Sequence, residues 1–172
     1  RTGCQVAVRL GSDREIQQAL EKCYGSMATM KGIIRDIGTA DSPFAADDGQ
    51  EDVDHLRDLA SEAPVIKLVN LIMSRAVQGR ASDIHIEPFE DRLAVRYRVD
   101  GVLVDAESPP RRLQAAVVSR IKIMAKMNIA ERRLPQDGRM RLQLEGKEFD
   151  LRISTVPTIY GESVVMRILD RS

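Results

Sequence analysis

The sequence predicts an α+β domain, in which an antiparallel sheet carries helices packed on one face. Two observations support this fold class. From residue 83 onward, several short segments alternate apolar and polar residues, as strands with one buried face do. Two longer segments repeat apolar residues at helical spacing, which gives each helix one apolar stripe to bury against a sheet. A truncated strand–helix unit and a flexible linker precede this domain.

Residues 1–25 contain one predicted strand, Gln5–Leu10, and one predicted helix. Ser12 is a favourable N-cap, and Glu15 completes a capping box three residues later. Gly25 ends the helical pattern. One strand and one helix cannot bury a core, so we interpret residues 1–25 as the end of a domain that begins upstream.

Residues 26–60 are interpreted as a linker, because breakers and acidic residues dominate them. Ile33 and Ile34 are expected to form a short packed turn inside it. Low hydrophobicity combined with like charge favours a flexible, solvated chain. The breakers are Gly38, Ser42, Pro43 and Gly49, and the acidic run is Asp47, Asp48, Glu51, Asp52 and Asp54.

Residues 61–172 carry the remaining pattern, beginning with a helix at Ala63. Pro64 suits the first helical turn, where its missing N–H costs nothing, and Gly79 ends the helix. A second helix is predicted from Pro110 to about Lys126. The apolar stripes are Val65, Leu68, Val69, Ile72, Met73 and Ala76 in the first helix, and Leu113, Val117, Ile121 and Met124 in the second.

Several strand candidates accompany the two helices. Asp100-Gly101 is a strong two-residue hairpin signal between two alternating runs. The candidates are Asp83–Ile86, Leu93–Val99, Val102–Ala106, Met140–Phe149 (broken by a turn at 145–147) with its partner Asp150–Thr155, and Ser163–Leu169.

Alternation places arginines together on the polar face of these strands. The strand residues concerned are Arg96, Arg98, Arg139, Arg141, Arg152 and Arg167, and Arg111 and Arg112 begin the second helix. One interpretation is a solvated face whose arginines pair with carboxylates across strands. The other is an anion site, because a planar guanidinium binds phosphate or carboxylate with two parallel hydrogen bonds.

Residues 92–112 offer no acidic neighbour on the strand face that carries Arg96 and Arg98, which favours the anion site. That interpretation requires that these two guanidinium groups are not held in internal carboxylate pairs.

Composition excludes several function classes. Lys plus Arg and Asp plus Glu are 26 each, so a basic nucleic-acid binder is not expected. Aromatic residues make up 3% with no Trp, which also disfavours base stacking. Apolar runs are too short to predict a membrane span. Cys4 and Cys23 form no CxxC pair, which favours a reducing compartment.

Asp83, His85 and Glu87 share one strand face, where alternate side chains lie about 6.5–7 Å apart. That spacing is wide for one metal ion, so we predict a polar interface and no metal site. The sequence contains no GxxxxGK[ST] phosphate-binding loop.

Five ordered motifs resemble one family of motor proteins. The segments are 63–70 (APVIKLVN), 82–88 (SDIHIEP), 96–101 (RYRVDG), 129–139 (IAERRLPQDGR), and 154–157 (STVP) with 161–162 (GE) and 167–170 (RILD). Residues 63–172 are similar to the domain that precedes the P-loop core of type II secretion ATPases. Pilus-assembly ATPases share most of these motifs.

The resemblance implies a PAS-like fold for residues 61–172, which pack on the ATPase core and support a hexamer. It implies that Arg96, Arg98, Arg111 and Arg112 reach toward a nucleotide in trans. Further interface residues are expected to be Asp83, His85, Glu87, Arg133, Gln136, Asp137 and Arg139. The longer protein is expected to be an ATPase that uses ATP and Mg²⁺ to power protein export across the outer membrane. This stretch lacks the Walker motifs and is expected to be inactive alone, without either cofactor.

The resemblance also implies partners and a location. Residues 1–25 are similar to the end of a domain that docks on the cytoplasmic domain of an inner-membrane type II secretion protein, the L-type subunit. The other partners are further copies of the chain, and the location is the cytoplasm at the inner face of the inner membrane. The alternatives are the N-domain of a type IV pilus assembly ATPase, or a stand-alone PAS-like sensor or adaptor.

Overall fold

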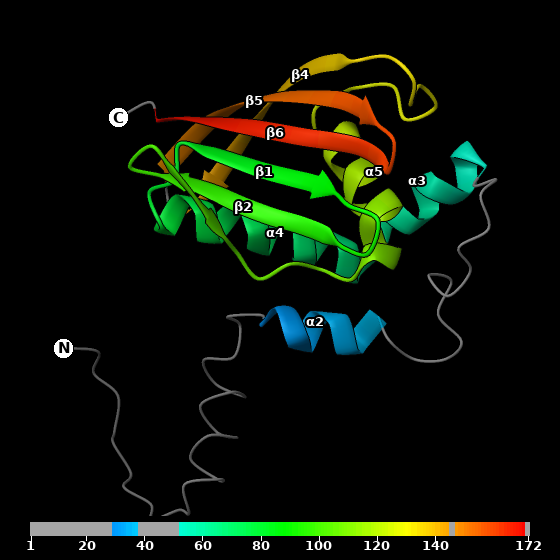
Figure 1. Ribbon diagram of the computed structural model, residues 1–172, viewed down its shortest axis with the longest axis horizontal. Coiled ribbons are helices and arrows are strands. Elements are labelled where there is room, and N and C mark those ends of the chain that lie inside the picture. Colours follow the sequence, from blue (N-terminus) through cyan, green and yellow to red (C-terminus); the bar gives the residue numbers. More distant parts are fainter. Residues whose placement is uncertain (1–28, 38–51, 145–146, 171–172) are drawn as a thin grey trace, which may run out of the picture.

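The structure is a computed structural model that describes residues 29–37, 52–144 and 147–170. These residues form four α-helices, one short 3₁₀ helix and six strands (Figure 1). The helices are α2 (Met30–Ile37), α3 (Val53–Ser61), α4 (Ala63–Gln78), η2 (Arg111–Leu113) and α5 (Gln114–Met124). The strands are β1 (Asp83–Pro88), β2 (Leu93–Val99), β3 (Val102–Asp105), β4 (Gln136–Leu144), β5 (Lys147–Thr158) and β6 (Gly161–Asp170).

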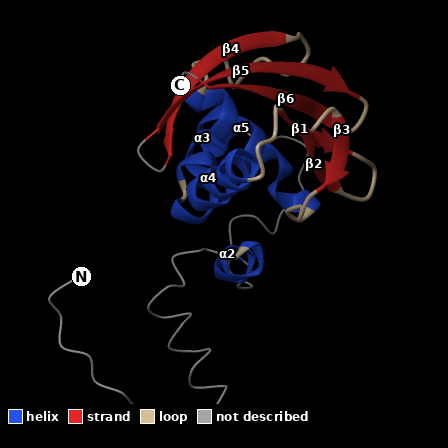
Figure 2. Ribbon diagram, turned by 90° about the vertical axis from the view of Figure 1, so that its left-hand side faces the viewer, coloured by secondary structure: helices blue, strands red, loops and turns tan. Residues whose placement is uncertain are grey.

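The six strands form one antiparallel sheet in the order β3-β2-β1-β6-β5-β4. The first and last strands along the chain are not at the edges, because β6 returns to pair with β1. Helices α3, α4 and α5 cover the same face of the sheet, and α2 lies beyond them (Figure 2). None of the described helices lies on the opposite face, which we call the outer face (Figure 1).

The core lies between the sheet and the helices. Alternate residues of the strands face it, among them Ile84, Ile86, Val95, Leu151, Ile153, Val164 and Met166. The stripe of α4 and the buried residues of α5 meet them, and both stripes are those predicted from helical spacing. Burial of apolar side chains at about 1.5–3 kcal/mol each, before entropy, is the main force that holds the helices on the sheet.

One polar bond ties α4 to the sheet inside this core. The Tyr97 hydroxyl of β2 donates to the Ile72 carbonyl at 2.9 Å. Burial raises the pKa of Tyr97 to about 12, against a lowering by the charge of Arg75, so the phenol keeps its proton at neutral pH.

The structure confirms the predicted α+β class, and the antiparallel sheet with helices on one face is consistent with a PAS-like domain. Two strand boundaries were wrong. Strand β4 begins at Gln136, four residues before the predicted start, and Lys147–Phe149 belongs to β5. The described sheet therefore has six strands, and residues 145–146, between β4 and β5, lie outside the described residues.

Two helices lie in the range that was interpreted as a flexible linker: all of α2, and α3 up to residue 60. Met30, Ile33, Ile37 and Leu59 belong to the hydrophobic core. Few apolar residues are available there, but they are spaced to reach α4 and α5. The predicted strand–helix unit at 1–25 and the centre of the acidic run lie outside the described residues, and the division into domains stays a prediction.

Candidate anion site on the outer sheet face

Strand register places five charged residues in one row across the outer face. Arg98 of β2 lies opposite Asp83 of β1, and Asp83 lies opposite Arg167 of β6. Arg167 lies opposite Arg152 of β5, which lies opposite Arg139 of β4. We call Arg98, Arg167, Arg152 and Arg139 the arginine row, and Asp83 is the one carboxylate inside it.

Asp83 neutralises one half of the row. Its side chain is 8% exposed, and its two oxygens accept from Arg167 Nε at 2.9 Å and Ser82 Oγ at 2.8 Å. Arg98 Nε lies 3.5 Å from the second oxygen. Burial alone would raise the pKa of Asp83. The bonds from Arg167 and Ser82, with the charges of Arg167 and Arg98, outweigh burial and hold the pKa below 3.8.

Arg96 and Arg98 do not meet the condition set by the anion-site interpretation. Arg96 forms an ion pair with Glu87, and Arg98 lies against Asp83 and donates to the Gly101 carbonyl at 3.0 Å. Both carboxylates come from β1, outside residues 92–112. The expectation that this window offers no acidic neighbour was also wrong, because Asp105 of β3 lies opposite Arg96. The assignment of nucleotide contacts to these two arginines stays a prediction, and the geometry does not favour it.

Arg111 and Arg112 are not brought to the row. They lie in η2, and the Arg111 guanidinium donates to the Glu90 carbonyl in the turn between β1 and β2. Arg112 is exposed, and its guanidinium makes no bond with the described residues. Their predicted nucleotide contacts are likewise untested.

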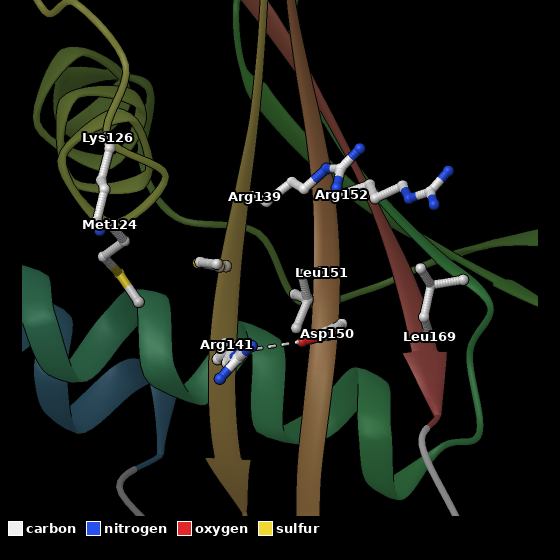
Figure 3. Close-up of a pocket in the computed structure, with 9 residues that line it drawn as sticks. Met124, Lys126, Arg139, Arg141, Asp150, Leu151, Arg152 and Leu169 are labelled. Atoms are coloured by element: carbon white, nitrogen blue, oxygen red, sulfur yellow. Dashed lines mark ion pairs between the residues drawn. The ribbon is translucent and has the colours of Figure 1, made fainter.

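The other half of the row is unpaired. Arg139 and Arg152 are exposed, lie directly opposite each other, and form no ion pair within the described residues. Figure 3 shows the two side chains leaving neighbouring strands in the same direction. Like charges placed opposite on neighbouring strands destabilise a sheet, so an anion between them would relieve this repulsion.

A depression of about 360 Å³ lies over this half of the row. Its lining includes three guanidinium groups, which are donors that suit an oxyanion, whereas the Ser154 hydroxyl there donates to Asp137. The charged and polar lining residues are Asp83, Asp137, Arg139, Arg152, Ser154 and Arg167. Arg141, two residues beyond Arg139 on the same face, differs because it pairs with Asp150 at 3.5 Å and Glu148 at 3.6 Å (Figure 3).

The predicted interface residues differ in the ion pairs and hydrogen bonds that they form within the domain. Glu87 holds Arg96, and His85 Nδ1 lies 3.8 Å from Glu87. Burial lowers the pKa of His85 below 6.5, and Arg98 and Arg96 add to this, while Glu87 and Asp83 oppose it. The imidazole is therefore neutral at pH 7. In the described ranges, no three His, Cys, Asp or Glu side chains lie together so that they could hold a metal ion.

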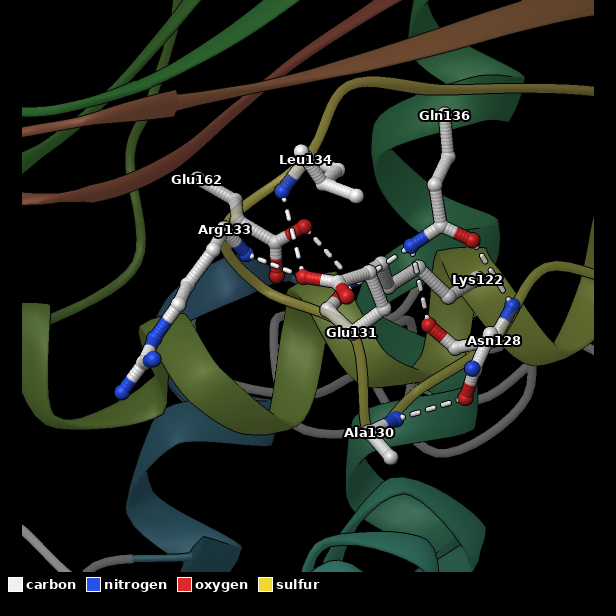
Figure 4. Close-up of polar contacts among 8 residues, drawn as sticks. All are labelled: Lys122, Asn128, Ala130, Glu131, Arg133, Leu134, Gln136 and Glu162. Atoms are coloured by element: carbon white, nitrogen blue, oxygen red, sulfur yellow. Dashed lines mark hydrogen bonds and ion pairs between the residues drawn. The ribbon is translucent and has the colours of Figure 1, made fainter.

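The remaining interface candidates belong to the segment 126–139 and its hydrogen bonds. Gln136 turns inward, donating to the Asn128 and Glu131 carbonyls at 2.9 and 3.0 Å and accepting from the Asn128 N–H at 2.9 Å (Figure 4). Asp137 accepts from Ser154 on β5. Of the interface candidates in this segment, the two cations, Arg133 and Arg139, are exposed.

A buried lysine anchors the same segment, and the sequence reasoning missed it. Lys122 of α5 is 1% exposed, and its Nζ lies 2.5 Å from Glu162 Oε1 at the start of β6. The same Nζ donates to the Glu131 carbonyl at 2.6 Å, while the Glu131 carboxylate accepts from the Arg133 and Leu134 N–H groups (Figure 4). The lysine thus joins α5, the loop before β4 and β6, and so fixes where β4 begins.

Gly138 explains why the chain can enter β4 at this point. A Cβ atom there would lie 2.7 Å from the Ala125 carbonyl oxygen and 2.8 Å from Met127 Cε. The end of α5 therefore packs directly on the backbone of β4, one residue before Arg139. A larger residue would push the strand away from α5 and move the guanidinium.

The pH dependence of the free energy of unfolding should reveal how much the ionised Asp83 side chain stabilises the fold. A carboxyl group with a lowered folded-state pKa contributes stability above its unfolded value of 3.8, and this contribution is lost as pH falls through the folded pKa. We expect Asp83→Asn to destabilise the 172-residue chain at about pH 6, and the difference from the parent chain to shrink at about pH 3. Urea unfolding at both pH values measures this. A difference independent of pH would contradict it.

Arg152 and Arg167 are the candidate site residues that the sequence assignment omitted. Alternation had placed both on the arginine face, but only strand order shows that they stand beside Arg139. The described part of the chain thus presents an open sheet face on which three arginines line one depression, a set of groups that can hold an anion.

Comparison with known proteins supplies the family. The family model described as "Type II/IV secretion system protein" matches residues 58–172, and the chain belongs to this family. It is 62% identical over 170 residues to type II secretion system protein E of Xanthomonas campestris, covering 99% of the chain and 29% of the relative. It is 44% identical over 173 residues to the type IV pilus assembly ATPase PilB of Myxococcus xanthus, covering 99% of the chain and 30% of the relative.

A third relative is the type II secretion system protein HxcR of Pseudomonas aeruginosa, at 46% identity over 162 residues, covering 92% of the chain and 34% of the relative. The chain thus spans about a third of the length of the curated relatives it matches. None of the helices in the described part of the chain is long and apolar enough to cross a membrane.

Proposed function

We propose that this chain is a regulatory region of a type II secretion ATPase, and that its arginine row contacts the phosphates of a nucleotide held by a neighbouring subunit. The observation that carries this is the pair Arg139 and Arg152, two exposed guanidinium groups in direct register without a carboxylate. Arginines that reach a transferring phosphoryl group from another subunit stabilise the charge that develops on its oxygens.

The division of the outer face supports Arg139 and Arg152 over Arg96 and Arg98. An arginine already paired with a carboxylate must give up that pair before it binds phosphate, and the exchange cancels much of the gain. Arg139 and Arg152 carry no such cost. The depression of about 360 Å³ beside them leaves room for a phosphate group between the two strands.

We extend the proposal, on the basis of the family, to the ATP-binding core, the oligomeric state, the location and the partner of the longer protein. The phosphate-binding loop lies in a core that this stretch does not contain, so ATP and Mg²⁺ bind there and the 172-residue chain alone hydrolyses no ATP. The longer protein assembles as a hexamer. It works in the cytoplasm at the inner face of the inner membrane, where an L-type subunit is its partner.

The type II branch is favoured by the relatives. The type II relative from Xanthomonas campestris is 62% identical, against 44% for the pilus assembly ATPase of Myxococcus xanthus. Pilus assembly is the second candidate, since the match to that ATPase also covers 99% of the chain.

Subunit mixing tests the contact between subunits. One form of the longer protein would carry a disabled phosphate-binding loop and intact arginines, and the other an intact core with Arg139→Ala and Arg152→Ala. Each form alone should be nearly inactive. Mixed assemblies should recover ATP turnover, because one subunit supplies the core and its neighbour the arginines. Absence of recovery in assemblies shown to contain both forms would contradict contact in trans.

A further inference from the structure

We propose that Asp83 is a positioning residue that presents Arg167 as a third anion contact beside Arg152 and Arg139. This inference rests on the proposed function of the arginine row. It assigns to Asp83 a role inside the domain, in place of the direct interface contact predicted from sequence. It also adds Arg167 to the phosphate-binding set.

The hydrogen bond from Arg167 to Asp83 leaves the two terminal amino groups of the Arg167 guanidinium available. Asp83 Oδ1 accepts from Nε of Arg167 at 2.9 Å, which is the nitrogen nearest the backbone. The two terminal amino groups of Arg167 make no bond within the described residues. A guanidinium held through Nε keeps those amino groups available for a second partner.

Glu87 provides the contrast on the same strand. It binds Arg96 through a terminal amino group, Nη2, and so occupies the end that would meet a phosphate. Two carboxylates of β1 therefore treat their arginines differently. Glu87 occupies a terminal amino group of Arg96. Asp83 instead holds Arg167 through Nε and leaves its terminal amino groups exposed.

The surroundings of Asp83 make it a rigid support. The residue is 5% exposed, and the Ser82 hydroxyl donates to Oδ2 at 2.8 Å. Arg98 Nε lies 3.5 Å from the same oxygen, so the carboxylate is held from both neighbouring strands. Arg167 itself is 67% exposed and would be mobile without this anchor.

The ligand class follows from the geometry. Arg167, Arg152 and Arg139 stand on three adjacent strands and line one depression together with Ser154. Three guanidinium groups in line suit an extended polyanion with several oxygens, such as the phosphate chain of a nucleotide, better than a single carboxylate.

The test is a double-mutant cycle on ATP turnover in the longer protein. Asp83→Asn and Arg167→Ala should each lower kcat by about 10-fold, with KM for ATP changed by less than about twofold, because a separate core binds the nucleotide. The double variant should lose about 10-fold rather than about 100-fold, since Asp83 acts through Arg167. Asp150→Asn, which removes a carboxylate from Arg141 on the same face, should leave turnover unchanged.

The outcomes separate the two proposals. Wild-type turnover of Asp83→Asn and Arg167→Ala, with a loss in Arg139→Ala and Arg152→Ala, would overturn the positioning role alone. Wild-type turnover of all four variants would overturn the proposed function. Independent losses that multiply in the double variant would show that Asp83 acts by another route.

A measurement on the unmodified 172-residue chain covers the case in which Asp83→Asn does not fold. Nitrogen-15 relaxation of the arginine Nε–H groups should show Arg167 ordered, and Arg139 and Arg152 mobile. Inorganic triphosphate at low salt should shift all three resonances. Equal mobility of Arg167 and Arg139, or no shift of Arg167, would overturn the proposal.

Discussion

Replacement of both Arg139 and Arg152 by alanine in the longer protein should lower kcat for ATP hydrolysis by about 10²–10³-fold, the loss typical of removing a donor that stabilises transition-state charge. KM for ATP should change far less, because the core binds the nucleotide in both forms. The physical reason is that these guanidinium groups stand free of carboxylates and can follow the charge that develops on the phosphate oxygens.

Arg141→Ala is the matched control for this loss. Arg141 lies on the same strand and face as Arg139, and its side chain is 68% exposed, but it is shared between Glu148 and Asp150. Its removal should leave turnover close to wild type. Arg139→Lys should give an intermediate rate, since lysine keeps the charge and loses the planar fork. Equal losses from Arg139→Ala and Arg141→Ala would show a general charge effect and refute the specific contact.

Lys122→Met should destabilise the folded 172-residue chain by about 3–5 kcal/mol, the cost of leaving one member of a buried ion pair without its partner. The substitution leaves the Glu162 carboxylate 8% exposed with no cation, and it removes a donor to the Glu131 carbonyl. Urea unfolding followed by circular dichroism measures the loss. The loop before β4 should exchange its amide hydrogens faster as well, because Lys122 joins it to α5.

Two variants control the lysine experiment. Lys126→Met changes an exposed lysine just beyond α5 and should have an effect below about 0.5 kcal/mol. Lys122→Met combined with Glu162→Leu should be less destabilised than Lys122→Met alone, because no unpaired charge remains inside. A loss below about 1 kcal/mol for Lys122→Met would show that the pair does not hold the loop.

Periodic patterns predicted the parts of the fold in which one face is buried and the other solvated. The stripe from Val65 to Ala76 predicted α4 with its bounds, and Asp100-Gly101 predicted the turn between β2 and β3. In these elements, local pattern and tertiary packing agree. The family resemblance added the PAS-like assignment and the expectation that arginines reach a nucleotide.

Elements that depend on tertiary contact were not predictable in the same way. Pro135 and Gly138 read as breakers, yet Gly138 lies inside β4 because the Ala125 carbonyl packs against it. Lys122 lies off the predicted stripe of α5. It is buried because α5 packs on more than one side, and Val118 and Ser119 are buried with it.

The sequence predicted which residues share the outer face, but it did not predict which of them stand side by side. Alternation identifies which residues share a face, but it does not give the order of the strands. The return of β6 to pair with β1 places Asp83 between Arg98 and Arg167, and leaves Arg139 and Arg152 beyond the reach of the β1 carboxylates. Only this order separates the paired arginines from the free ones.

The most direct test of the central claim is a structure of the assembled longer protein with a non-hydrolysable ATP analogue and Mg²⁺. The proposal predicts that guanidinium nitrogens of Arg139 and Arg152 lie about 2.7–3.0 Å from phosphate oxygens held by the neighbouring subunit. An assembly in which the outer sheet face meets solvent, with the phosphates bound only by groups of the core, would contradict it.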